Sequence, residues 1–301
     1  MRIILFNHFH RGDLFTHKEF VRHMKQLIPD NTFEYWHFNH PKVNLDLQIP
    51  LVNTPHNLDR NAHFIWEGEV AGINTWIGVW SDIFNKHQGV NMFSLYESWE
   101  NIFDKFGLKL REDPESYLPT IDYSFFNLKN IDEYVSTPKK RILFCNGKPM
   151  SGQSFDSDMG DIINAFAEKH PEIDFICTQK FPTMSLNVLF TDDIIDDREE
   201  FFTGVNPYWF NKPTNICDLN EISYLSTKCD AIVGKNSGPF VFCETYDNLK
   251  DESKVIVSFC KGPKETMSNG VDVKARYKHV TDHTHSSIVE TIQWVINETK
   301  T

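Results

Sequence analysis

The sequence has little of what a membrane span or a general nucleic-acid binder requires. No apolar stretch approaches the roughly 20 residues of a membrane-spanning helix. Lys and Arg number 30 against 42 Asp and Glu, so the formal net charge is −12 and no broad basic surface is available for a polyanion. Met1 leads directly into an apolar segment without a signal-peptide pattern. We therefore expect a cytoplasmic protein with no membrane span, for which nucleic acid is a possible but not a favoured partner.

Cysteine and histidine patterns typical of metal sites are missing as well. The six cysteines are scattered, and most lie within or beside apolar segments, which favours buried reduced thiols over disulfides or metal ligands. The histidines are dispersed; His8/His10 and His283/His285 alternate, but no third ligand stands near either pair. Residues 192–193 and 196–197 contain paired aspartates that read as a solvated acidic loop. We expect no metal and no cofactor.

Two well-known phosphate-binding motifs are also absent. No Gly-Lys-Ser/Thr stands at the spacing of a Walker motif, and no Gly-x-Gly-x-x-Gly occurs. The absence of both motifs disfavours a P-loop ATPase and a dinucleotide-dependent enzyme. A length of 301 residues at 35.2 kDa fits two compact α/β units.

The first half begins with the pattern of a parallel sheet. A buried-type strand over residues 2–7 is followed by a polar turn, and apolar residues at three- and four-residue steps then predict a helix through Leu27. A second strand is expected over residues 32–38, which completes a βαβ unit. Further along we predict strands at 63–66 and 74–79 and a helix at 93–106 that ends at Gly107.

The second half repeats this pattern after a polar stretch at residues 136–140. We place the domain boundary there, between an N-terminal domain at 1–136 and a C-terminal domain at 137–301. We expect the α/β fold class, with two Rossmann-like domains and a cleft between them. The expected elements are strands at 141–145, 174–177, 188–191, 231–233 and 255–259 and helices at 156–169, 219–225, 240–246 and 286–297.

The segment 230–239 is the most informative stretch of the chain. A strand ends at Gly234, and Pro239 suits the first turn of a following helix. Helix amides, with Lys235 and the Ser237 hydroxyl beside them, are suited to hold phosphate oxygens without a metal. An ordinary βα turn that needs glycine is the alternative. Asn236 and Gly238 complete this candidate donor loop.

A second loop follows the first strand of the second half, where ligands of open α/β sheets bind. Lys148 offers positive charge and Gln153 offers hydrogen bonds, although a solvated loop is the alternative. The donor-side candidates here are Asn146, Gly147, Lys148, Ser151, Gln153 and, after the next strand, Thr178.

The loop after the first strand of the chain carries the candidate bases. Asp13, His10 and His8 compete for the removal of a proton from an acceptor hydroxyl, and Gly12 allows the backbone to approach the acceptor. Asp13 also fits a helix N-cap. Trp76 fits either an acceptor-side sugar platform or a buried strand position.

These motifs resemble those of GT-B glycosyltransferases of the heptosyltransferase type, which transfer a sugar from a nucleotide diphosphate. Gly12-Asp13 resembles the Gly-Asp loop that lies near the acceptor in that family. The run from Asp218 through residues 229–230 to 234–239 resembles its donor-site block, in which a polar residue precedes Ser-Gly-Pro. This chain departs from the pattern at Asn236, where the family commonly has Asp, and it lacks the His that follows there. Two roles are open for Glu244: a contact with a sugar or ribose hydroxyl in place of that His, or a cap or surface position.

The resemblance implies an enzyme, a nucleotide-sugar-dependent glycosyltransferase that acts on a hydroxyl acceptor, a glycan or a related molecule, without a catalytic metal. It makes 1–136 the acceptor-side domain and 137–301 the nucleotide-sugar-binding domain. Three alternatives remain at this stage. One is a bacteriophage-type glycosyltransferase that modifies hydroxymethylated DNA bases, which the net charge disfavours. The others are a sugar-nucleotide epimerase and a non-catalytic sugar-nucleotide binding protein.

Overall fold

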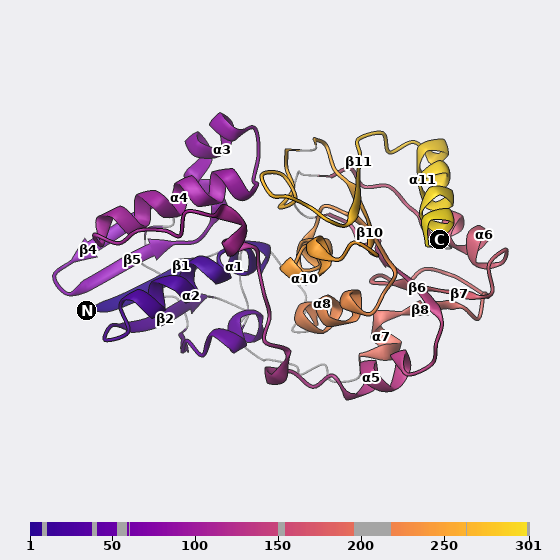
Figure 1. The fold of residues 1–301 in the computed structure, drawn as a ribbon, viewed down its shortest axis with the longest axis horizontal. Helices are drawn as coiled ribbons and strands as arrows, with labels where there is room; N and C mark the ends of the chain where they lie inside the picture. The colour runs from indigo at the N-terminus through magenta and orange to yellow at the C-terminus, as the bar shows by residue number, and fades with distance from the viewer. Residues whose placement is uncertain are drawn as a thin grey trace. The chain divides into compact units, whose positions relative to one another are not determined.

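The chain forms two compact units, which Figure 1 draws as ribbons in a computed structural model. The structure describes residues 1–7, 11–37, 41–52, 59, 61–149, 154–195, 218–262 and 264–299. Among them, the first unit comprises Met1–Phe125 and the second begins at Phe126. Helix α5 (Lys129–Val135) therefore belongs to the second unit, whereas the boundary expected from the sequence assigns it to the first. The Tyr134 hydroxyl explains this, because it donates to Asp174 Oδ2 of the second unit at 2.8 Å.

The first unit is built on a sheet in which parallel strands dominate. Its order is β3-β2-β1-β5-β4, and of these five strands β4 runs antiparallel to β5 while the other pairs are parallel. The strands are β1 (Arg2–Asn7), β2 (Thr32–His37), β3 (Leu51–Val52), β4 (Phe64–Glu67) and β5 (Val70–Asn74). β1 lies in the centre and is buried after its first residue.

Helices around this sheet are short, with two exceptions. They are α1 (Arg11–Thr16), α2 (Lys18–Leu27), α3 (Ser81–His87) and α4 (Met92–Lys105), with 3₁₀ turns η1 (Pro41–Leu47), η2 (Ile77–Trp80), η3 (Pro114–Tyr117) and η4 (Tyr123–Phe125). Phe20 of α2 stacks between Trp99 of α4 and Tyr117 of η3, at ring-centroid distances of 5.4 and 4.2 Å. This stack ties the helices together. None of the helices in the described ranges combines the length and the apolar character that a bilayer span needs.

Two sequence expectations for the first unit are wrong in detail. The helix expected through Leu27 is divided into α1 and α2 at His17. The strand expected at 74–79 ends where it was meant to begin, because Asn74 Oδ1 accepts a hydrogen bond from the Trp76 amide at 2.9 Å. This Asx turn bends the chain out of the sheet. The alternation of apolar residues that follows belongs to η2.

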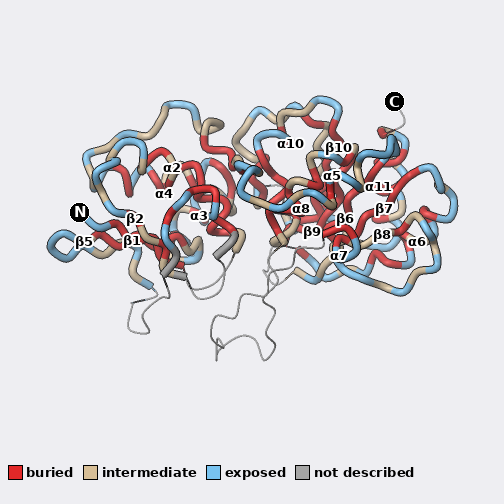
Figure 2. The backbone as a smooth tube through the Cα atoms, turned by 90° about the horizontal axis from the view of Figure 1, so that it is seen from below, coloured by how far each residue is buried: buried red, intermediate tan, exposed pale blue. Residues whose placement is uncertain are grey.

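The second unit contains a fully parallel sheet. Its order is β11-β10-β9-β6-β7-β8, and each neighbouring pair is parallel. The strands are β6 (Lys140–Cys145), β7 (Ile173–Cys177), β8 (Val188–Phe190), β9 (Ala231–Lys235), β10 (Val255–Phe259) and β11 (Arg276–Val280). β7, β9 and β10 are buried along their whole length, as the red segments of Figure 2 show. Continuous apolar strands of this kind are typical of sheets covered on both faces.

Helices α6 (Gly160–Ala167), α8 (Leu219–Thr227) and α11 (His285–Glu298) connect or follow these strands, with α7 (Thr191–Ile194), α9 (Gly238–Val241) and α10 (Tyr246–Lys250) as shorter pieces. The helix expected at 156–169 begins only at Gly160. The helix expected at 240–246 is wrong: α9 ends at Val241, and Thr245 starts α10 by accepting the Asn248 amide with its side chain. A Thr cap within an apolar run stops one helix and starts the next.

Gly234 allows two elements of the second unit to pack closely. A Cβ at this position would lie 2.5 Å from a ring carbon of Phe240 and 2.8 Å from Cβ of Cys145. Phe240 belongs to α9, and Cys145 ends β6, so the absent side chain brings α9 against the middle of the sheet.

We expect Gly234→Ala to lower the free energy of unfolding by roughly 2–3 kcal/mol, because overpacking forces neighbours out of their rotamers. Urea denaturation measures this. Gly262→Ala is the matched control, since no atom lies within 4 Å of a Cβ built there. A similar small effect for both variants would contradict the close packing.

Candidate functional site

Asp13 lies at the carboxyl edge of the first sheet, where β1 and β5 end side by side. It is the third residue of α1 and is only 8% exposed. Its Oδ2 accepts the backbone amide of Ile77 at 3.2 Å, and the side chain of Asn7 forms a further hydrogen bond with the carboxylate. Asp13 is not the N-cap of α1, because it lies inside that helix and its side chain accepts a hydrogen bond from the Ile77 amide.

Burial raises the pKa of Asp13 to about 7, and the Ile77 amide and the Asn7 side chain oppose this rise. Desolvation disfavours the ionised carboxylate, whereas hydrogen bonds from donors favour it. The result is a carboxyl group whose charge changes near neutral pH. That is the property required of a general base working at neutral pH.

His17, the residue before α2, is buried, and the sequence did not indicate it as a candidate. Trp99 Nε1 donates to His17 Nδ1 at 2.6 Å. Burial lowers the pKa of His17 to about 3, opposed by a hydrogen bond with the Thr75 backbone, so the ring is neutral. The Asn7 amide also donates to the Thr75 carbonyl, at 3.2 Å. Asn7 thus fixes the end of β5, from which the loop to Ile77 starts.

The other acceptor-side candidates differ in how well the structure places them. Gly12 precedes Asp13 in α1 and is partly exposed. The Trp76 ring folds back over its own loop, where a Cβ at Gly78 would meet ring atoms at 2.4 Å. His8 and His10 lie outside the described residues.

The raised pKa of Asp13 predicts a stability change with pH. Between about pH 4 and pH 7 the native state holds a proton that the unfolded chain releases, so this group lowers stability as the pH rises. We expect Asp13→Asn to exceed the wild type in unfolding free energy above pH 7, by an amount on the order of 3 kcal/mol. The two proteins should converge below pH 4. Denaturant titrations at pH 4 and 8 measure this, and a pH-independent difference would argue against a buried titrating carboxyl.

The carboxyl edge of the second sheet gathers most of the donor-side candidates. Asn146 follows β6 and fixes the loop after β7: its Nδ2 donates to the Gln179 carbonyl and its Oδ1 accepts the Gln179 amide, both at 2.9 Å. Thr178 Oγ1 lies 3.5 Å from the same Oδ1. The Gln179 side chain accepts the Lys148 amide at 3.2 Å, beside Gly147. The structure therefore brings these candidates together, with Asn146 engaged in joining two loops.

Positive charge at this edge comes from two lysines of different loops. Lys235, the last residue of β9, is 2% exposed and donates to the Ser157 carbonyl at 2.8 Å. Lys148 is exposed. Their ammonium nitrogens lie 3.6 and 3.4 Å from the two oxygens of Asp156. Burial lowers the pKa of Lys235, and Asp156 opposes that effect.

Ser237 supplies a free hydroxyl in the same loop. It is 8% exposed and precedes α9, but it does not cap that helix, and its Oγ has no hydrogen-bond partner among the described residues. Asn236 is bound in place, since its amide donates to the Phe259 carbonyl at 3.0 Å and its side chain to the Glu265 carbonyl. Gly238 has open space where a Cβ would be. α9 has only four residues, so its dipole is small. The groups at this edge that are suited to bind an anion are therefore Lys235, Lys148 and the Ser237 hydroxyl.

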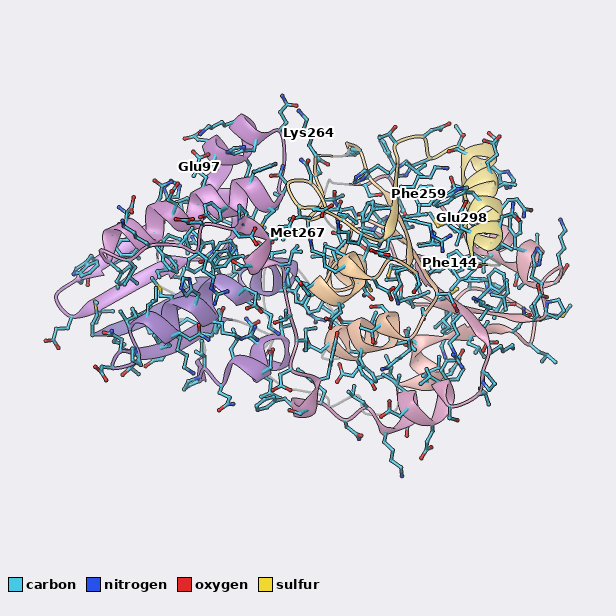
Figure 3. The ribbon with its side chains drawn as sticks, in the orientation of Figure 1. Glu97, Phe144, Phe259, Lys264, Met267 and Glu298 are labelled. Carbon is cyan, nitrogen blue, oxygen red and sulfur yellow. The ribbon has the colours of Figure 1, made fainter. Side chains whose placement is uncertain are left out.

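Glu244 is turned into the second unit. It is 1% exposed, and the Tyr277 hydroxyl donates to its Oε1 at 2.8 Å. Burial raises the pKa of Glu244 to about 7, against hydrogen bonds from Tyr277 and from the Met267 and Ser268 amides. Met267 and Lys264, which Figure 3 labels, belong to the loop after β10. In this structure the carboxylate therefore holds that loop, and its contact with a sugar or ribose hydroxyl stays a prediction.

Ser151 and Gln153 lie outside the described residues. Within the described ranges, no three His, Cys, Asp or Glu side chains gather in the geometry of a metal site. Sequence reasoning missed Asn7 and Asp156. Asn7 ends a predicted strand and so carried a usable signal, whereas nothing in the sequence indicated that Asp156 lies between two lysines.

Comparisons with known proteins reveal the fold. No protein-family model matches the chain, and no curated protein sequence matches it either. Among solved structures, the Escherichia coli heptosyltransferase WaaC with ADP is 8% identical, with a TM-score of 0.51 over 99% of both chains. The iron-containing dodecameric glycosyltransferase TibC from enterotoxigenic E. coli H10407 is 15% identical, with a TM-score of 0.50 over 99% of this chain and 78% of that one. The chain has the GT-B fold of two α/β domains with parallel sheets, as the motifs predicted.

Proposed function

We propose that this protein is a glycosyltransferase that moves a sugar from a nucleotide-diphosphate sugar to a hydroxyl acceptor. The observation that carries the proposal is Asp13, a buried carboxyl group at the carboxyl edge of the first sheet whose pKa is raised to about 7. In this proposal the first unit presents the acceptor and the second holds the donor. The GT-B fold supports that division of labour.

The chemical step follows from the charges that each unit offers. Asp13 takes the proton of the acceptor hydroxyl as its oxygen attacks the anomeric carbon of the sugar. The bond from that carbon to the diphosphate oxygen breaks, and the leaving group carries away the electron pair as negative charge. Asn7 and the Ile77 amide hold Asp13 in place for the transfer.

Lys235 and Lys148 stabilise the departing diphosphate, and the free hydroxyl of Ser237 donates to one of its oxygens. Two ammonium groups at one sheet edge supply the positive charge that a divalent cation supplies in other enzymes. This supports a reaction without a catalytic metal or another cofactor. The structure of WaaC was solved with ADP, which makes ADP the first nucleotide to test here.

The alternatives are less well supported by the described contacts. Several basic residues near β11 that a DNA-modifying enzyme could use are engaged locally: Lys274 pairs with Asp272, Arg276 with Glu298, and Lys278 lies over the Trp294 ring. An epimerase would form product from the sugar nucleotide alone, and a binding protein would show no turnover.

We propose a cytoplasmic location for this activity. The free, buried thiols support it: Cys145, Cys177, Cys229, Cys243 and Cys260.

A nucleoside diphosphate should raise the melting temperature of this protein without Mg²⁺, because a ligand that binds only the folded state stabilises it by mass action. A thermal-shift panel of ADP, UDP, GDP, CDP and dTDP measures this.

We expect Lys235→Met to weaken the binding of the best nucleotide at least tenfold, since a buried charge partner is lost. Lys274→Met, which makes the same charge change at an exposed position, should bind normally. If no nucleotide moves the melting temperature, the donor site is wrong.

Asp13→Asn should lower kcat/KM for transfer by roughly 10²–10⁴-fold, because the general base is lost. In the wild type the rate should rise with pH through about 7, as Asp13 loses its proton. Release of the nucleoside diphosphate in the presence of an acceptor pool measures both. Nucleotide binding by Asp13→Asn should stay normal, and Asp82→Asn, an exposed change in α3, is the activity control. Full activity in a folded Asp13→Asn enzyme would overturn the assignment of the base.

A further inference from the structure

One carboxylate links the two lysines of the donor-side edge. Asp156 Oδ1 lies 3.6 Å from Lys235 Nζ, and Asp156 Oδ2 lies 3.4 Å from Lys148 Nζ. Lys148 and Asp156 both belong to the connection between β6 and α6, whereas Lys235 ends β9. Each oxygen of the carboxylate thus faces a different ammonium group, as two oxygens of a bound phosphate would.

The buried lysine requires a negative partner. Lys235 is 2% exposed, and burial lowers its pKa, while the negative charge of Asp156 acts in the opposite direction. The Ser157 carbonyl provides a neutral acceptor but no charge. Asp158 adds a weaker attraction, yet its Oδ1 already accepts the Gly160 amide at 2.9 Å at the start of α6. Asp156 is therefore the main counterion of Lys235 in this edge.

The bridge is arranged so that it breaks easily. Charge-assisted hydrogen bonds between nitrogen and oxygen usually measure about 2.7–2.9 Å. Both contacts of Asp156 are longer, and its side chain is 51% exposed. The Lys148–Asp156 pair is exposed on both sides, and such pairs are worth little, roughly 0–1 kcal/mol, whereas the Lys235–Asp156 pair has one buried partner and a long separation. A ligand that brings more negative charge to both lysines would replace Asp156 at small cost.

We propose that Asp156 is a built-in stand-in for the donor's diphosphate: it occupies the position of a phosphate between Lys148 and Lys235 and leaves when a nucleoside diphosphate binds. This inference rests on the proposed function and adds a determinant of specificity to it. An anion must outcompete the carboxylate at two lysines at once, which favours a diphosphate over a single phosphate. The returning carboxylate also helps to expel the nucleoside diphosphate after transfer.

The test compares anion affinities of the full chain by isothermal titration calorimetry without divalent cations. The probes are inorganic pyrophosphate, orthophosphate and ADP, and the variants are Asp156→Asn and Asp156→Ala. Asp161→Asn is the matched control, because Asp161 is an exposed carboxylate five residues away in the first turn of α6. The double variant Asp156→Asn with Lys235→Met removes the lysine on which the effect depends.

We expect Asp156→Asn and Asp156→Ala to bind pyrophosphate and ADP roughly threefold to tenfold more tightly than the wild type, as follows from loss of a competing ion pair and a negative charge. Orthophosphate should gain at least as much, so that selectivity for pyrophosphate falls. Asp161→Asn should match the wild type. The gain should shrink in 0.5 M salt, because exposed charges are screened, and it should be absent in the Lys235→Met background.

Unchanged or weaker pyrophosphate binding in both Asp156 variants, with normal melting temperatures and a wild type that does bind, would overturn this inference alone. An equal gain in Asp161→Asn would do the same, since the effect would then come from general charge. If the wild type and all variants bind neither pyrophosphate nor any nucleoside diphosphate, the donor site itself is refuted together with the proposed function. The two failures are therefore distinguishable.

Discussion

The parallel direction of the buried strands is the constraint on which the rest of the structure depends. β6, β7, β9 and β10 are apolar, covered on both faces and hydrogen-bonded in parallel, so the residues that follow each of them emerge at one edge. Asn146, Thr178 and Asn236 come from distant parts of the sequence and lie at that edge for this reason alone. The first unit obeys the same rule, because β1 and β5 end together and bring Asn7 near the loop to Ile77.

Desolvation shifts the pKa of one buried group in each unit, upward for Asp13 and downward for Lys235. In the first, burial of Asp13 disfavours its negative charge and raises its pKa to about 7. In the second, burial of Lys235 disfavours its positive charge, and the nearby carboxylate of Asp156 partly compensates for this. In each unit, burial therefore disfavours a charge that a ligand can compensate. In the proposed reaction, an acceptor hydroxyl gives a proton to Asp13 and a diphosphate gives negative charge to Lys235.

Most strands could be predicted from the sequence, because continuous apolar runs between turn residues leave few alternatives, but β3, β5 and β11 were not. The failures have local causes. The Asn74 side chain bends the chain after β5 and converts an apparent strand into a 3₁₀ turn, and Thr245 divides an apparent helix into two. Both events depend on a single side-chain hydrogen bond, which periodicity does not reveal. β11 was not predicted because all of its residues except Val280 are only partly buried, and Arg276 and Lys278 interrupt its apolar pattern.

The sequence by itself determined the α/β class and the loops that carry Asp13, Lys235 and Ser237, since these follow from apolar patterning and from the position of polar residues after strands. Only the tertiary structure decided what those side chains do. It buried Asp13 and paired it with Asn7 and Ile77, turned Glu244 toward Tyr277, and set Asp156 between Lys148 and Lys235. Charge and pKa depend on neighbours distant in the sequence, and chain spacing contains no information about them.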